Sequence, residues 1–283
     1  MTSSPSLRFR PDSYCYTVCS RPIPAPAFYL VNRSVCIASP QLVFVQLATT
    51  LPLVLLIKLG DELCGMYTST FDEEKRDRQR DAVLCTVEEL RSFIDSATWM
   101  RGSARARKAL PFIVEGSCSA RETELEMLLC LPPRHGGYGF PKPQMNMRVD
   151  FNREARAFAK QAYARCDLCW PDCKLDVEYD GRAWHEDEER AWHDKARANG
   201  LQQMGYRVIS VSKTELDSRP LLDSAAIVLS GIVGHRLRDS MAAALEKRDI
   251  LHETLLNSWR HPVFSRVCVS SDGTEDMDRF VWE

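Results

Sequence analysis

Segment 165–181 places two carboxylates on either side of a short turn, and this arrangement constrains the fold more than any other part of the chain. Its middle carries Pro171 and Asp172, which are typical of turns because proline presets φ and aspartate tolerates tight backbone conformations. A turn centred just after Asp172 gives a β-hairpin in which Asp167 lies opposite Glu178, with Cβ atoms about 5 Å apart. Opposed like charges destabilise a sheet, and a divalent cation removes the repulsion because hard cations take oxygen ligands. The sequence therefore predicts a hairpin that carries a site for metal-assisted hydrolysis.

The second strand of this hairpin, expected over 174–181, concentrates its acidic residues on one face. Side chains alternate along a strand, so one face carries Leu175, Val177 and Tyr179 and the other carries Asp176, Glu178 and Asp180. Three carboxylates are costly to bury without a cation, although a solvent-facing strand of an antiparallel sheet would give the same pattern.

Residues that follow and precede the hairpin favour the first interpretation. His185 comes shortly after the strand, and Asp194 lies on the next predicted helix, 186–204, where it could orient the imidazole for acid–base chemistry. Glu122 begins an earlier helix whose start is marked by Ser119 in a capping-box pattern. That helix could pack against the sheet and add a further carboxylate.

Composition sets the broad class of the protein. The chain has 283 residues, 45% hydrophobic and 27% charged, which is ordinary for a globular protein of one large domain or two modest ones. Its net charge of −2 means that any nucleic-acid partner must be held by a local basic patch. The 11 cysteines are odd in number and no apolar leader is visible, so we expect reduced thiols and a cytoplasmic protein.

One apolar stretch, 42–59, is nearly long enough to span a bilayer. Gln46, the pair Thr49 and Thr50, and Pro52 interrupt it. We therefore expect a buried helical hairpin and no membrane partner.

The order of predicted elements favours an α/β or α+β fold. The second half reads as helix, strand, strand, strand, helix, strand and helix, which suits a mixed sheet flanked by helices. The first half combines short strands, such as 14–18 and 28–37, with helices. We expect a mostly helical N-terminal domain over 1–115, with a possible nucleic-acid or partner-binding role, and a second domain over 116–283.

The acidic hairpin and its surroundings resemble a known superfamily. Asp167, the run 177–181 (VEYDG), then Trp184 and His185, are similar to the PD-(D/E)XK nucleases, and more narrowly to bacterial proteins related to very short patch repair endonucleases. Asp194 and the tail 201–211 extend the resemblance, which covers roughly residues 115–220. It implies a restriction-endonuclease-like fold.

The resemblance also implies a site and an activity. Its positions are Glu122, Asp167, Glu178, Asp180, His185 and Asp194. Asp167, Glu178 and the carbonyl of Tyr179 would bind Mg²⁺ or Mn²⁺, with His185 activating water and Asp194 orienting it. The expected activity is hydrolysis of DNA phosphodiester bonds, with no small-molecule cofactor.

One departure leaves a second function open. Asp180 stands where the superfamily's signature carries lysine. The alternative is an inactive nuclease fold that binds DNA as an antitoxin-like regulator, and segment 38–63 weakly resembles the region preceding the nuclease domain in AbiEi-type regulators.

Three further patterns have competing interpretations. Cys166, Cys169 and Cys173 could form part of a zinc site, but we expect small core thiols because Cys166 and Cys169 should point to opposite faces of a strand. Trp184 and Trp192 could stack on bases or belong to the core. The basic segment 101–108 could contact phosphates or be the solvated face of a helix.

Overall fold

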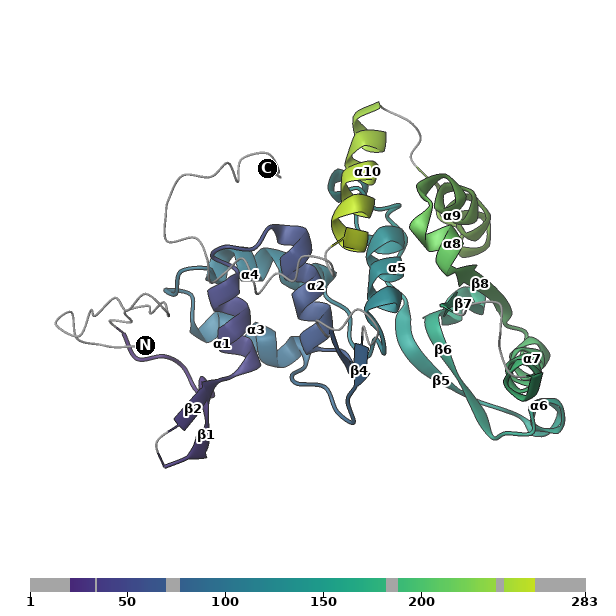
Figure 1. Cartoon of the computed structure of the whole chain (residues 1–283), viewed down its shortest axis with the longest axis horizontal. Coiled ribbons are helices and arrows are strands. Elements are labelled where there is room, and N and C mark those ends of the chain that lie inside the picture. The colour runs from purple at the N-terminus through teal and green to yellow at the C-terminus, as the bar shows by residue number, and fades with distance from the viewer. Residues whose placement is uncertain (1–20, 34, 70–76, 182–187, 238–241, 258–283) are drawn as a thin grey trace.

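The computed structural model describes residues 21–33, 35–69, 77–181, 188–237 and 242–257. In this part of the chain, helices and two short hairpins make up the N-terminal half, and a four-stranded sheet with covering helices makes up the C-terminal half (Figure 1). The predicted strand over 14–18 lies outside the described residues.

Within the described ranges, the N-terminal half contains four α-helices and two antiparallel strand pairs. The helices are α1 (Pro40–Leu47), α2 (Leu53–Leu63), α3 (Val87–Ser96) and α4 (Ser103–Ala109), with a 3₁₀ turn, η2 (Leu110–Phe112), after α4. The strand pairs are β1 (Phe28–Asn32) with β2 (Val35–Ala38), and β3 (Tyr67–Ser69) with β4 (Asp77–Gln79).

Local sequence explains why the apolar stretch 42–59 forms two helices. The Ser39 side chain caps α1 by accepting from the backbone N–H of Leu42 at 3.3 Å. Pro52 then occupies the N-cap position of α2, where its fixed φ ends one segment and begins the next. The predicted helical hairpin is confirmed, and none of the helices in the described ranges has the length and apolar character needed to cross a bilayer.

The C-terminal half carries one mixed sheet and its helices. In chain order it contains α5 (Ala120–Cys130), η3 (Pro133–His135), β5 (Gln144–Asp150), α6 (Arg153–Ala159), β6 (Tyr163–Trp170), η4 (Pro171–Cys173), β7 (Leu175–Asp180), α7 (Glu188–Gln203), β8 (Arg207–Ser212), α8 (Lys213–Asp217), α9 (Arg219–Val233) and α10 (Ala242–Asn257). The strand order is β5-β6-β7-β8, antiparallel except for the parallel pair β7 and β8. The α/β class with a mixed sheet is thereby confirmed, whereas α6 was not predicted.

The two faces of the sheet pack against different cores. One large cluster of buried apolar residues runs from Ala27 to Leu255 and includes Leu168 and Val177 of the sheet, so it joins both halves of the chain. Helix α5 lies between the N-terminal helices and the sheet (Figure 1). A smaller cluster on the other face includes Phe151, and there α6 packs on α7. The site therefore lies on a sheet that is covered on both sides.

A left-handed residue, Asn146, interrupts β5 at φ 48°. Asparagine tolerates this conformation better than most residues. Met145 packs in the large cluster and Met147 against the small one, so the regular alternation of side chains along a strand is broken at Asn146. Pairing with β6 holds on both sides of the interruption, which leaves Asn146 and Asp167 outside the ladder.

The same interruption corrects the prediction for two cysteines. Cys166 and Cys169 were expected on opposite faces of β6, but both are fully buried in the small cluster. Strand parity changes next to Asp167, so residues three apart share a face. Both thiols are free.

Two buried carboxyl groups meet between α2 and α5. Asp61 and Glu126 are almost completely buried, and Asp61 Oδ2 and Glu126 Oε2 have no hydrogen-bond partner among the described residues. Burial raises the pKa of Asp61, and the neighbouring Glu126 raises it further. Burial likewise raises the pKa of Glu126 to about 8, against the opposing effects of Lys142 and Cys130.

We expect Glu126→Gln to stabilise the protein at alkaline pH. Because the folded-state pKa of Glu126 is raised, its neutral form favours folding, and this contribution is lost as pH rises from the unfolded pKa of about 4.5 towards 8. Glutamine stays neutral, so the variant should gain at least about 1 kcal/mol at pH 9 and much less at pH 5. Thermal unfolding across pH measures this difference. Glu88→Gln, at a side chain 82% exposed, is the control, and equal shifts at both pH values would contradict the account.

Candidate active site

The predicted hairpin forms with the predicted register. Leu168 pairs with Val177 and Trp170 with Leu175. The turn is the 3₁₀ segment Pro171–Cys173, closed by Lys174 in the left-handed region at φ 49°. The ladder ends at Leu168–Val177, so Asp167 and Glu178 are the next residue on each strand.

Asp167 is the central carboxylate of the site. Its Oδ2 accepts the backbone N–H of Tyr179 at 3.0 Å, which fixes the side chain across the two strands. Burial, followed by the nearby charges of Glu122 and Glu178, raises the pKa of Asp167 to about 7. Three acidic residues from α5, β6 and β7 are therefore close enough to repel one another.

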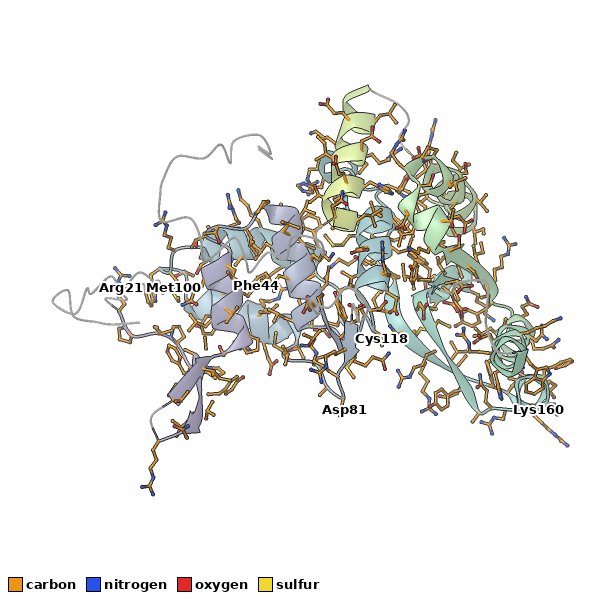
Figure 2. All side chains as sticks on the ribbon, viewed as in Figure 1. Arg21, Phe44, Asp81, Met100, Cys118 and Lys160 are labelled. Carbon is orange, nitrogen blue, oxygen red and sulfur yellow. The ribbon has the colours of Figure 1, made fainter. Side chains whose placement is uncertain are left out.

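Glu122 is held firmly at the start of α5. Ser119 caps this helix by accepting from the backbone N–H of Glu122 at 3.1 Å. The Glu122 carboxylate accepts the backbone N–H of Cys118 at 2.9 Å, the Asn146 side-chain amide at 2.7 Å and the Ser119 hydroxyl at 3.0 Å. Figure 2 labels Cys118, at the passage from the N-terminal helices to α5. With both oxygens engaged, Glu122 is suited to position its neighbours and contribute charge.

Glu178 is paired with an arginine from α7. Arg197 Nη2 donates to Glu178 Oε2 at 2.7 Å, and Arg197 Nη1 lies 2.7 Å from Oε1. Nη1 directs its hydrogen bond to the carbonyl oxygen of Arg165 at 2.9 Å, and Oε1 has no hydrogen bond among the described residues. The guanidinium thus ties α7 to β6 and β7 and lies against both carboxylate oxygens of Glu178.

Asp176 adds a fourth carboxyl group on the same strand as Glu178. It is fully buried, and its carboxyl group interacts with the side chains of Glu178 and Cys166. Burial and the nearby Glu178 raise its pKa to about 9. Asp176 is therefore held as a neutral acid beside Glu178 and Cys166.

The structure brings together some of the predicted site residues and leaves others apart. Glu122, Asp167 and Glu178 converge, and Tyr179 contributes its N–H to Asp167. Asp194 Oδ1 lies 4.0 Å from Arg197 Nε, and Asp180 pairs in register with Ser212 at the end of β8. His185 and Trp184 lie outside the described residues. Trp192 is 52% exposed and contacts His193 edge to face, so it is not a core residue.

Two residues of the site were not predicted. Arg197 follows Asp194 by three positions, a spacing that places both on one helix face, and this signal could have identified it. Asn146 gave no comparable signal, because its role depends on a left-handed backbone in the middle of a strand.

The donor set is incomplete for an all-protein metal cage. No three His, Cys, Asp or Glu side chains are arranged to hold a metal ion within the described ranges. Magnesium, however, is usually bound through one or two carboxylates with water and substrate phosphates completing the shell. The mutual repulsion of the carboxylates, together with Glu178 Oε1, which has no hydrogen bond among the described residues, fits a divalent cation of this kind.

Comparisons with known proteins give relatives without an assigned activity. No family model and no solved structure matches the chain. The uncharacterized proteins MT2308 and Rv2248, from two strains of Mycobacterium tuberculosis, are each 24% identical to it over 136 residues. The match covers 48% of this chain and 45% of each relative, so the chain matches a little under half the length of these relatives.

Proposed function

We propose that the chain is a metal-dependent endonuclease that hydrolyses DNA phosphodiester bonds on a restriction-endonuclease-like sheet. The observation that carries this proposal is the position of Asp167 between Glu122 and Glu178 where β6 and β7 leave their ladder. Carboxylates kept close together despite their repulsion are typical of cation sites. The resemblance of the hairpin to PD-(D/E)XK nucleases supports the same reaction.

Each residue of the site has a role in this reaction. Asp167 and Glu178 would provide the carboxylate ligands of the metal, with the Tyr179 carbonyl as a third oxygen. A bound Mg²⁺ or Mn²⁺ would act as a Lewis acid towards the phosphate and lower the pKa of water. Glu122 holds Asn146 and the start of α5 in place. The resemblance assigns His185, outside the described residues, as the acceptor of the proton from the attacking water, and Asp194 as the residue that would orient it.

The exposed face next to the site offers positive charge for a nucleic-acid backbone. Arg148 and Arg165 are exposed cross-strand partners on β5 and β6. The Arg148 guanidinium lies 4.0 Å from the ring centroid of Tyr163 and pairs with Asp150 at 2.7 Å, and these two contacts hold it in place. Arginines of this kind contact DNA phosphates and fix register without reading sequence. They supply the local basic patch that a chain of net charge −2 requires.

A plasmid-cleavage assay tests the proposal. The full chain should nick supercoiled DNA with Mg²⁺ or Mn²⁺ and be inactive with a chelator. Asp172→Asn, in the exposed turn of the same hairpin, should cleave like wild type. Intact DNA under all metal conditions, from a protein that is folded by circular dichroism, would refute the endonuclease.

The alternative is a nuclease fold that binds DNA without cutting it. The observation that favours it is the pairing of Glu178 with Arg197, together with Asp180 at the signature lysine position. A gel shift with DNA that persists without any cleavage would support this regulator.

A further inference from the structure

Arg197 is the one positively charged side chain that contacts Glu178 in the described part of the chain. It lies on α7, and its contacts do more than hold that helix against the sheet. Arg197 reaches from α7 to the Glu178 carboxylate and the Arg165 carbonyl, with a side chain 24% exposed. Its guanidinium stays charged at any pH at which the protein is folded. The positive charge that opposes the acidic cluster is therefore built into the protein and does not depend on pH.

The acidic residues differ in what they can still bind. Both carboxylate oxygens of Glu122 already accept hydrogen bonds, from Cys118, Ser119 and Asn146. Asp167 accepts from Tyr179 through Oδ2, and Glu178 Oε2 accepts from Arg197. Arg197 Nη1 also lies 2.7 Å from Glu178 Oε1, so a cation that binds Glu178 must share this oxygen with the guanidinium, whereas Asp167 offers Oδ1. Two oxygens suffice for one partly hydrated divalent ion and not for a pair.

We propose that Arg197 is the positioning residue of this site: its guanidinium takes the place of a second cation, fixes Glu178 beside Asp167 and limits the site to one divalent ion. The inference rests on the proposed function, because it assumes that the carboxylates bind a metal. The signature lysine of the superfamily is replaced by Asp180 in this chain. Under this proposal Arg197 supplies a fixed positive charge beside Glu178 in place of that lysine.

This role predicts opposite effects on metal binding and on cleavage. A cation fixed beside the site repels an incoming divalent ion, so removing it strengthens metal binding even though the carboxylate is held less well. A residue that only stabilised the fold would weaken both binding and cleavage when lost. Tighter metal binding combined with reduced cleavage therefore identifies a positioning role for Arg197.

Calorimetric titration of the metal-free full chain with MnCl₂, without DNA, tests this inference. Wild type should bind one ion per chain. Arg197→Met should bind Mn²⁺ at least about fivefold more tightly, because the competing charge is gone, while its plasmid cleavage falls. Arg197→Lys, which keeps the charge, should match wild-type affinity within about twofold. Arg91→Met, at an exposed arginine of α3 paired with Glu88, is the matched control and should leave binding unchanged.

Each outcome separates this inference from the proposed function. Weaker Mn²⁺ binding by a folded Arg197→Met, or two ions per wild-type chain, would overturn the role of Arg197 and leave the endonuclease intact. One ion per wild-type chain with tighter binding by Arg197→Met, but no cleavage by any form, would support the role of Arg197 and refute the endonuclease. Absence of Mn²⁺ binding by wild type would overturn both.

Discussion

Asp167→Asn should lose DNA cleavage by at least about 100-fold, as expected when a metal ligand is removed, and yet unfold at a higher temperature than wild type in metal-free buffer at pH 8. Asparagine keeps the oxygen that accepts the Tyr179 N–H at 3.0 Å. It removes a negative charge that burial and the neighbours Glu122 and Glu178 make unfavourable. The expected gain is at least about 1 kcal/mol, or several degrees in Tm.

The sign of the pH dependence follows from the raised pKa of Asp167. Its neutral form favours folding, so its contribution is present at acid pH and is lost as pH rises from the unfolded value of about 3.8 towards 7. The gain from Asp167→Asn should therefore be large at pH 8 and small at pH 4.

Added Mn²⁺ tests whether Asp167 binds a metal ion or is only a carboxylate whose charge is unfavourable in its buried position. Mn²⁺ should raise the Tm of wild type, because a ligand that binds only the folded state stabilises it, and should leave Asp167→Asn unchanged. Asp172→Asn is again the control, and it should respond to Mn²⁺ like wild type. A variant that is less stable than wild type and still cuts DNA would contradict this account of Asp167.

Gly102→Ala should destabilise the protein by about 2–5 kcal/mol, the largest effect that we expect from adding one methyl group. Gly102 begins α4 at φ 100°, a conformation that alanine adopts only with strain. A Cβ there would also lie 2.1 Å from the carbonyl oxygen of Val45, so the backbone of α1 would have to move.

Substitution of a second glycine, Gly234, separates the cost of backbone strain from the cost of a steric clash. Gly234 has φ 70°, but a Cβ there meets no atom within 4 Å. Gly234→Ala should therefore cost only the backbone strain, about 1–2 kcal/mol. Urea unfolding of both variants measures the difference. Equal losses for the two would show that the contact between α4 and α1 is looser than the structure indicates.

The sequence predicted those parts of the fold in which local chemistry and long-range packing agree. The hairpin register followed from the turn at Pro171 and Asp172 and was confirmed. The start of α5 was predicted where the Ser119 side chain caps the backbone. The basic segment 101–108 forms the helix α4, where Arg107 pairs with Asp95 at 2.6 Å and Arg105 donates to the Leu51 carbonyl at 3.1 Å. For these two arginines, contacts within the protein account for the pattern, whereas a phosphate-binding role stays untested.

The features that the sequence did not predict depend on a single backbone conformation or on residues distant along the chain. The left-handed Asn146 changes the parity of two strands, which reversed the expected placement of Cys166 and Cys169. The contact between Asp61 and Glu126 joins α2 to α5 and leaves no periodic signal. The division at residue 115 stays a prediction, and one large cluster of buried residues contains side chains from both sides of it.

Crystals grown with MnCl₂ and measured at the manganese edge would test the central claim most directly. The account predicts one anomalous peak within about 2.0–2.3 Å of carboxylate oxygens of Asp167 and Glu178, with Arg197 still contacting Glu178. An absence of any peak there at saturating Mn²⁺, with the Glu178–Arg197 pair unchanged, would contradict the proposed cation site and, with it, the proposed endonuclease.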